Sequence, residues 1–270
     1  MNQAYLWIGF NLFILFLLSL DLGLFNRKVH KTTIKEALTW TCVWIGLALI
    51  FNGLVYHYAG QQKALEFFTA YLTEKSLSVD NIFVFLLIFS SLKIPDKYRH
   101  KVLFWGVLSA IVFRGIMIFA GVALLHRFHF VIYIFGAILI LTGSKMFFKK
   151  KEDVNSQPLM KWVLETFPHT SDVNGVHFIT TVKGKWTLTN LGVALALIEM
   201  SDLIFSLDSI PAVLSISSDL FIVYTSNIFA ILGLRSLFFV LEGAVDYFTY
   251  LSYGIATVLV FIGVRMLLPE

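Results

Sequence analysis

The feature that most limits what this chain can fold into is a series of long apolar segments. About 20 helical residues are needed to cross the roughly 30 Å hydrocarbon core of a bilayer. Eight segments reach that length, at approximately residues 4–25, 37–59, 66–92, 102–125, 129–148, 188–215, 220–243 and 248–268. Composition agrees, because 58% of the 270 residues are hydrophobic and only 14% are charged, against about 25% charged in an average soluble domain. The sequence therefore predicts an all-α, polytopic transmembrane bundle of about eight helices in contact with the lipid bilayer.

The distribution of basic residues predicts how this bundle is oriented. Fifteen of the 21 Lys and Arg lie in the segments 26–36, 93–101 and 145–187. Loops rich in Lys and Arg stay on the cytoplasmic side of a membrane. We therefore expect these three segments in the cytoplasm and the N-terminus outside. The basic excess is a topology signal, and it gives no reason to expect nucleic-acid binding.

The one long hydrophilic stretch is residues 149–187. Its apolar positions at 159–167 predict a short helix on the membrane surface. Residues 177–182 and 186–189 have the composition of a small hairpin. About forty residues are too few for an independent catalytic domain, so we interpret this stretch as a cytoplasmic linker.

The chain also contains a weak internal repeat. The pattern Glu74-x5-Asp80-Asn81-Ile82 resembles Asp202-x5-Asp208-Ser209-Ile210, and Arg114 and Arg235 follow in the same order. Each unit holds three helices, an odd number, so the second unit must enter the membrane from the opposite side, as in inverted-repeat transporters. The predicted organisation is an N-terminal helix pair (1–62), a first three-helix repeat (63–148), a cytoplasmic linker (149–187) and a second three-helix repeat (188–270).

Five carboxylates fall inside the predicted membrane helices: Glu74, Asp80, Glu199, Asp202 and Asp208. A charge in this position costs at least a few kcal/mol and usually faces a partner or a cavity. Neutral oxygens recur at helical spacing from Glu74 and Asp202: Ser78, Asn81, Ser206 and Ser209. Carboxylate, hydroxyl and amide oxygens form a hard ligand set that suits Mn²⁺, Mg²⁺ or Ca²⁺. The two stretches therefore predict a divalent-cation site.

Basic residues and a proline accompany the acids. We expect Lys75, Arg114 and Arg235 to form structural ion pairs inside the membrane, and pairing of this kind is also the alternative explanation for the acids. Pro211 has no N–H for the carbonyl of Leu207. It therefore predicts a helix break that leaves a backbone oxygen free near the acids.

Three segments resemble a known family. Tyr71–Phe83 and Glu199–Pro211 are similar to the two signature motifs of the TerC family, and Thr225–Arg235 is similar to the same family. The resemblance covers nearly the whole chain and extends to the Alx-like bacterial members. It implies a bacterial inner-membrane protein that exports Mn²⁺, a fold related to the LysE-type exporters, and an association with tellurite resistance. It also implies that the five acids line the metal path, supported by the four neutral residues named above.

The predicted function is therefore export of a divalent metal ion, with Mn²⁺ as the substrate and with proton exchange at Asp202 or Asp208 as the proposed coupling. Two alternatives remain open. One is a membrane scaffold or accessory protein of the metal or tellurite stress response. The other is an intramembrane enzyme, which is disfavoured because Gly-x-Gly-Asp, His-Glu-x-x-His and Gly-x-Ser-x-Gly do not occur in the chain. We expect a protein that is not an enzyme.

Overall fold

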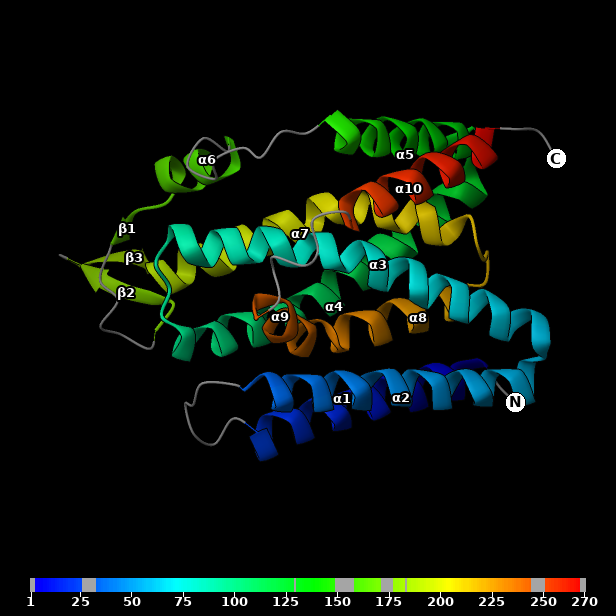
Figure 1. Cartoon of the computed structure of the whole chain (residues 1–270), viewed down its shortest axis with the longest axis horizontal. Coiled ribbons are helices and arrows are strands. Elements are labelled where there is room, and N and C mark those ends of the chain that lie inside the picture. Colours follow the sequence, from blue (N-terminus) through cyan, green and yellow to red (C-terminus); the bar gives the residue numbers. More distant parts are fainter. Residues whose placement is uncertain are drawn as a thin grey trace. The chain divides into compact units, whose positions relative to one another are not determined.

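A computed structural model describes residues 3–25, 33–128, 130–148, 158–170, 177–182, 184–243 and 251–267 (Figure 1). The chain separates into two compact units, residues 1–32 and residues 33–270. The first unit contains the apolar helix α1 (Gln3–Phe25). The second contains the helices α2 (Ile34–Ala59), α3 (Gln61–Ser91), α4 (Asp96–Arg127), α5 (Val131–Phe148), α6 (Pro158–Thr166), α7 (Asn190–Leu214), α8 (Leu220–Leu232), α9 (Leu234–Glu242) and α10 (Leu251–Leu267).

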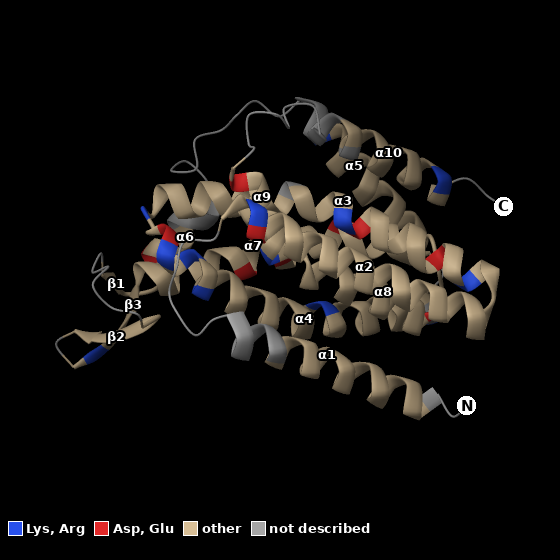
Figure 2. Ribbon diagram, turned by 60° about the horizontal axis from the view of Figure 1, so that its bottom comes forward, with Lys and Arg blue, Asp and Glu red and all other residues tan. Residues whose placement is uncertain are grey.

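The all-α polytopic prediction is confirmed. Among the described residues, three stretches are long and apolar enough to cross a membrane: Ile34–Ala59, Asp96–Leu125 and Leu220–Glu242. Shorter apolar stretches occur at Ala4–Ser19, Val131–Lys145 and Ala256–Leu267. Figure 2 shows that acidic and basic positions are few along most of the helical ribbon.

Helices α2, α3 and α4 begin earlier than hydropathy predicts, because their first turns are polar. Side-chain caps mark the starts of α2 and α8. The Thr33 hydroxyl accepts a hydrogen bond from the backbone N–H of Glu36 at 3.3 Å, at the start of α2. Asp219 accepts one from the N–H of Phe221 at 3.0 Å, at the start of α8. Each cap satisfies an amide that has no acceptor within its own helix.

The predicted span 220–243 is long and apolar enough to cross a membrane, as expected, but its helix is interrupted at Gly233, which separates α8 from α9. A Cβ at this position would lie 2.5 Å from Lys75 Nζ and 3.2 Å from Trp44 Cβ. Lys75 Nζ donates to the carbonyl oxygen of Ala230 at 3.2 Å. In an uninterrupted helix this oxygen would accept the N–H of Leu234, so the lysine of α3 takes the place of a helix hydrogen bond.

The predicted helix break at Pro211 is wrong, because α7 continues through the proline to Leu214. Pro211 stands in the last turn of α7, and its carbonyl accepts the N–H of Ser215 at 3.0 Å. A proline removes one hydrogen bond from a helix without ending it where the surrounding protein supports the segment. The residues around it, Ile210 and Ala212, are buried.

The linker contains the two predicted elements. The predicted short helix is α6, and the hairpin is β2 (Ile179–Val182) with β3 (Lys185–Thr189), which pair antiparallel; the place of α6 on the membrane surface stays a prediction. Gly184 has φ +77° in the turn between them, a conformation that favours glycine. The structure adds a short strand that the sequence analysis did not predict, β1 (His169–Thr170), which pairs in parallel with β3.

Packing within the second unit follows the order of the two sequence repeats. Each helix of the first repeat contacts its counterpart in the second: α3 lies on α7, α4 on α8 and α5 on α10 (Figure 1). The crossed contacts α3–α8 and α4–α7 are also present. Two three-helix units related by a twofold axis would make these pairings. They support the inverted repeat, which stays a prediction.

Successive long helices of the second unit alternate in direction, and the starts of α2 and α4 lie at the same end as the hairpin β2–β3 (Figure 1). At this end Arg99 of α4 pairs with Glu242 of α9, and a Cβ at Gly243 would lie 2.9 Å from Ile34 at the start of α2. The apolar core here joins α3, α4, α7 and α9. At the opposite end Glu66 of α3 pairs with Lys63 at 2.9 Å and accepts from the hydroxyl of Ser217 at 2.5 Å.

Candidate cation site between the two acidic helices

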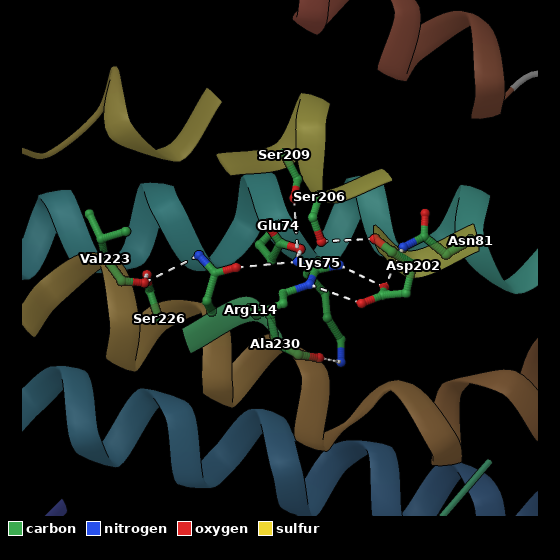
Figure 3. A network of polar contacts seen from close by, with 11 residues as sticks. Glu74, Lys75, Asn81, Arg114, Asp202, Ser206, Ser209, Val223, Ser226 and Ala230 are labelled. Carbon is green, nitrogen blue, oxygen red and sulfur yellow. Dashed lines mark hydrogen bonds and ion pairs between the residues drawn. The ribbon is translucent and has the colours of Figure 1, made fainter. Parts of the chain in front are cut away.

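Three charged side chains from three helices meet in the interior of the second unit (Figure 3). Glu74 of α3, Arg114 of α4 and Asp202 of α7 are 0%, 1% and 5% exposed. Nη1 of Arg114 pairs with Oε1 of Glu74. Nη2 of Arg114 lies 2.9 Å from Oδ1 of Asp202, and its Nε lies 3.4 Å from Oδ2. The two acids that occupy equivalent positions in the sequence repeat therefore share one guanidinium.

Neutral side chains complete this cluster. Asn81 donates to Oδ1 of Asp202 at 3.3 Å. The Ser209 hydroxyl and the Asn227 carbonyl oxygen accept from Nη1 of Arg114 at 3.4 Å and 3.3 Å. Ser206 donates to the backbone carbonyl of Asp202 at 2.8 Å. Three of the four predicted neutral residues thus lie in the network, and the fourth, Ser78, is buried on α3.

The charges in this cluster do not balance. Glu74 and Asp202 carry two formal negative charges when ionised, and Arg114 carries one positive charge. Oε2 of Glu74 is buried, and the described residues offer it no hydrogen-bond donor. A buried acceptor left in this way costs about 1–3 kcal/mol, and more when it is charged. The cluster therefore holds an oxygen that is suited to a further cation.

Two of the three remaining predicted acids, Glu199 and Asp208, face other partners. Glu199 lies one turn before Asp202 on α7 and accepts from the Ser109 hydroxyl of α4. Its Oε2 is buried and has no hydrogen-bond donor within the described part of the chain. Asp208 accepts from the Thr142 hydroxyl of α5 at 2.9 Å. Asp80 lies on α3, but its side chain is outside the described residues.

The structure therefore brings two of the five predicted acids into direct contact with one cation, and spaces two others along α7. In the described ranges, no group of three or more His, Cys, Asp or Glu side chains is placed to hold a metal ion. A single site built by all five acids stays a prediction.

The three predicted structural bases have different surroundings. Arg114 stands at the centre of the cluster. Lys75, the neighbour of Glu74 on α3, reaches the carbonyl of Ala230 at the division between α8 and α9. Arg235 is the second residue of α9 and is partly buried.

Three residues that contact the acids or Arg114 were not predicted from the sequence. These are Ser109, Thr142 and Asn227. The run Thr225-Ser226-Asn227 carried a usable signal, because three consecutive polar residues inside an apolar span are expensive unless they have partners. Ser109 and Thr142 are single small hydroxyls, and such residues occur commonly in membrane helices.

Fold and site together define a class. Large apolar side chains such as Ile50, Ile116 and Phe261 are 65%, 60% and 69% exposed, as expected of a surface that faces lipid. Ionic groups are buried within the same helical unit. The protein is thus a polytopic membrane protein with an intramembrane ionic site.

The chain belongs to the TerC family, because the family model described as "Integral membrane protein TerC family" matches residues 59–270. Among its relatives, the "Uncharacterized membrane protein STKORF319" of Myxococcus xanthus is 53% identical over 97% of this chain and 82% of the relative. The "Putative membrane-bound redox modulator Alx" of Escherichia coli K12 is 43% identical over 98% of this chain and 86% of the relative. No solved structure matches the chain.

Proposed function

We propose that this protein exports a divalent metal ion, with Mn²⁺ as the expected substrate, across the bacterial inner membrane. The observation that carries the proposal is the buried cluster of Glu74, Arg114 and Asp202. It holds two carboxylates against one guanidinium, and one carboxylate oxygen lacks a donor among the described residues. An intramembrane site of this kind is expected in proteins that move ions or protons.

The oxygens around this cluster fit the substrate. Mn²⁺ is held by carboxylate, carbonyl and water oxygens. Glu74 and Asp202 supply carboxylates, and Asn81, Ser206 and Ser209 lie in the same network. This set does not by itself separate Mn²⁺ from Mg²⁺ or Ca²⁺, so the choice of Mn²⁺ depends on the family resemblance.

The spacing of acids along α7 supports movement of an ion. At a rise of about 1.5 Å per residue, Glu199 lies about 4.5 Å before Asp202 along the helix axis and Asp208 about 9 Å after it. Acids at successive depths provide successive oxygen ligands. Fixed neutral partners such as Ser109 and Thr142 hold Glu199 and Asp208 in place.

A dithiol redox reaction within this chain is not favoured, although one relative is named as a redox modulator. The chain contains a single cysteine, Cys42, and one cysteine cannot form an intrachain disulfide. Transport of a redox-active metal would connect this chain to redox balance without such chemistry.

The proposal is tested by reconstituting the purified protein alone in liposomes and following Mn²⁺ flux with a metal-sensitive dye inside. Asp202→Asn and Glu74→Gln, which keep size and remove charge, should each lower the Mn²⁺ flux at least tenfold. The matched control is Asp96→Asn, because Asp96 pairs with Arg99 at the start of α4, away from the cluster. It should retain wild-type flux.

The same vesicles separate the alternatives. Absence of Mn²⁺ flux through the folded wild-type protein would favour the scaffold or accessory role. Flux of Mg²⁺ or Ca²⁺ in place of Mn²⁺ would correct the substrate. Mn²⁺ flux that is indifferent to an imposed pH gradient would exclude the expected proton exchange.

A further inference from the structure

We infer that Arg114 is an internal counter-cation that occupies the Glu74–Asp202 carboxylate pair when no metal ion is bound, and that the transported ion binds by displacing it. The inference rests on the proposed function and names the residue that sets the affinity of the site for the transported ion. Arg114 then tunes substrate affinity directly, beyond any part it has in holding helices together.

The contacts of Arg114 place its charge where a metal ion would bind. Its two terminal nitrogens reach one oxygen of Glu74 and one oxygen of Asp202. These acids come from different helices, α3 and α7, and from equivalent positions of the sequence repeat. A divalent cation between the same two carboxylates would be adjacent to the guanidinium in an interior where like charges repel strongly. Arg114 and the metal ion therefore compete for the same oxygens.

Arg114 also has a neutral site to which its charge can move. Nη1 already lies 3.4 Å from the Ser209 hydroxyl and 3.3 Å from Oδ1 of Asn227. Asn227 is 0% exposed and belongs to α8, a different helix from the one that carries Asp202. A guanidinium that leaves the carboxylates can keep these two hydrogen bonds, and this contact avoids leaving it buried without acceptors.

Competition of this kind provides a route to release. Two unopposed buried carboxylates would hold a divalent ion tightly, and an exporter must let the ion go. The return of Arg114 replaces the charge that the departing ion removes, so neither the occupied nor the vacant pair is left without a cation. A static buried ion pair contributes little net stability. Stability alone therefore does not account for the buried carboxylate pair, whereas exchange between Arg114 and the transported ion does.

The inference predicts that weakening Arg114 tightens metal binding. Lysine keeps the charge but presents a single point of contact in place of a two-sided fork. Arg114→Lys should therefore lower the Kd for Mn²⁺, on the order of tenfold for the loss of one charge-assisted hydrogen bond, while the rate of Mn²⁺ flux falls. A residue with a purely structural role would give weaker binding together with slower flux.

Binding is measured on the purified full-length protein in detergent by titration calorimetry with Mn²⁺ alone, and flux in the liposomes described above. The matched control is Arg99→Lys, since Arg99 also pairs with two acids, Asp96 and Glu242, but at the start of α4. Its Kd should stay within about twofold of wild type. Asn227→Leu provides the opposite case: it removes the neutral acceptor for Arg114 and should weaken Mn²⁺ binding.

Arg114→Met gives a second test that uses stability as its measurement, so it remains informative if substitution of Arg114 destabilises the fold. It leaves two buried carboxylates unopposed, so the metal-free protein should unfold at a lower temperature, and Mn²⁺ should raise its unfolding temperature more than that of wild type. A folded Arg114→Lys protein that binds Mn²⁺ no more tightly than wild type would overturn the inference and leave the proposed function standing. A wild-type protein that neither binds nor transports Mn²⁺ would overturn both.

Discussion

At the scale of residues, the sequence identifies which side chains matter better than it identifies their partners. Helical spacing placed Glu74, Ser78 and Asn81 on one stripe, and all three are buried. It could not show that Arg114 would lie between Glu74 and Asp202, because the three residues belong to different helices and Arg114 and Asp202 are 88 residues apart. Periodicity reports which face of a helix is apolar, and it carries no information on which distant helix meets that face.

A residue-scale prediction concerns Ser109. Its hydroxyl donates to Glu199, whose other oxygen is buried without a donor among the described residues. Ser109→Ala should lower the free energy of unfolding by about 1–3 kcal/mol, because it removes a hydrogen bond to a buried carboxylate. The thermal midpoint of the purified protein should fall by several degrees, at about 2–4 °C per kcal/mol for a chain of this size. Ser76→Ala is the matched control, since Ser76 is exposed and bonds to the Leu72 carbonyl of its own helix, and an equal loss there would contradict the argument.

At the scale of elements, hydropathy predicted where the helices lie and missed how one of them is interrupted. The segment 220–243 is apolar at most positions, and its mean hydropathy does not indicate the division at Gly233. At the division, Lys75 of α3 and Trp44 of α2 occupy the space of a side chain at position 233, and Lys75 donates to the carbonyl of Ala230. Contacts with neighbouring helices are invisible to any pattern within the segment itself.

The pair α5–α10 gives a prediction at this scale. A Cβ at Gly143 would lie 2.8 Å from the carbonyl oxygen of Ala256, and one at Gly263 would lie 2.7 Å from that of Gly136. Gly143→Ala and Gly263→Ala should each destabilise the protein by about 1–3 kcal/mol, because backbone must move apart to admit the methyl group. In contrast, Gly53→Ala in α2 meets nothing within 4 Å and should be neutral or stabilising by up to about 1 kcal/mol. Thermal unfolding of the three variants checks the sign, and unchanged midpoints for both α5–α10 variants would show that the helices are not closely packed.

At the scale of the whole molecule, the arrangement of the second unit agrees with the topology expected from its basic residues. Arg99, the start of α2 and the hairpin β2–β3 belong to segments predicted to be cytoplasmic. The turn at Gly60 and the cluster of Glu66 with Ser217 lie at the opposite ends of the same helices. The short connections α2–α3, α3–α4 and α7–α8 each return the chain along the preceding helix, so the side of one such loop determines the side of the next. The side on which each loop lies therefore stays a prediction from charge alone, whereas the pairing of the repeats needed the three-dimensional contacts.

The last prediction tests that sidedness with two exposed positions from opposite ends of the unit. In a Cys42→Ala background, which removes the exposed native thiol, a cysteine at Thr181 of β2 should react with a membrane-impermeant maleimide only after bacterial cells are lysed. A cysteine at Gln61, at the start of α3 beside the Gly60 turn, should react in cells whose inner membrane is intact. The reverse pattern would place the basic loops outside and overturn the predicted orientation. Labelling of both positions from one side would mean that α3 and the helices after it do not cross the bilayer as proposed, because an odd number of spans between Gln61 and Thr181 requires the two to lie on opposite faces.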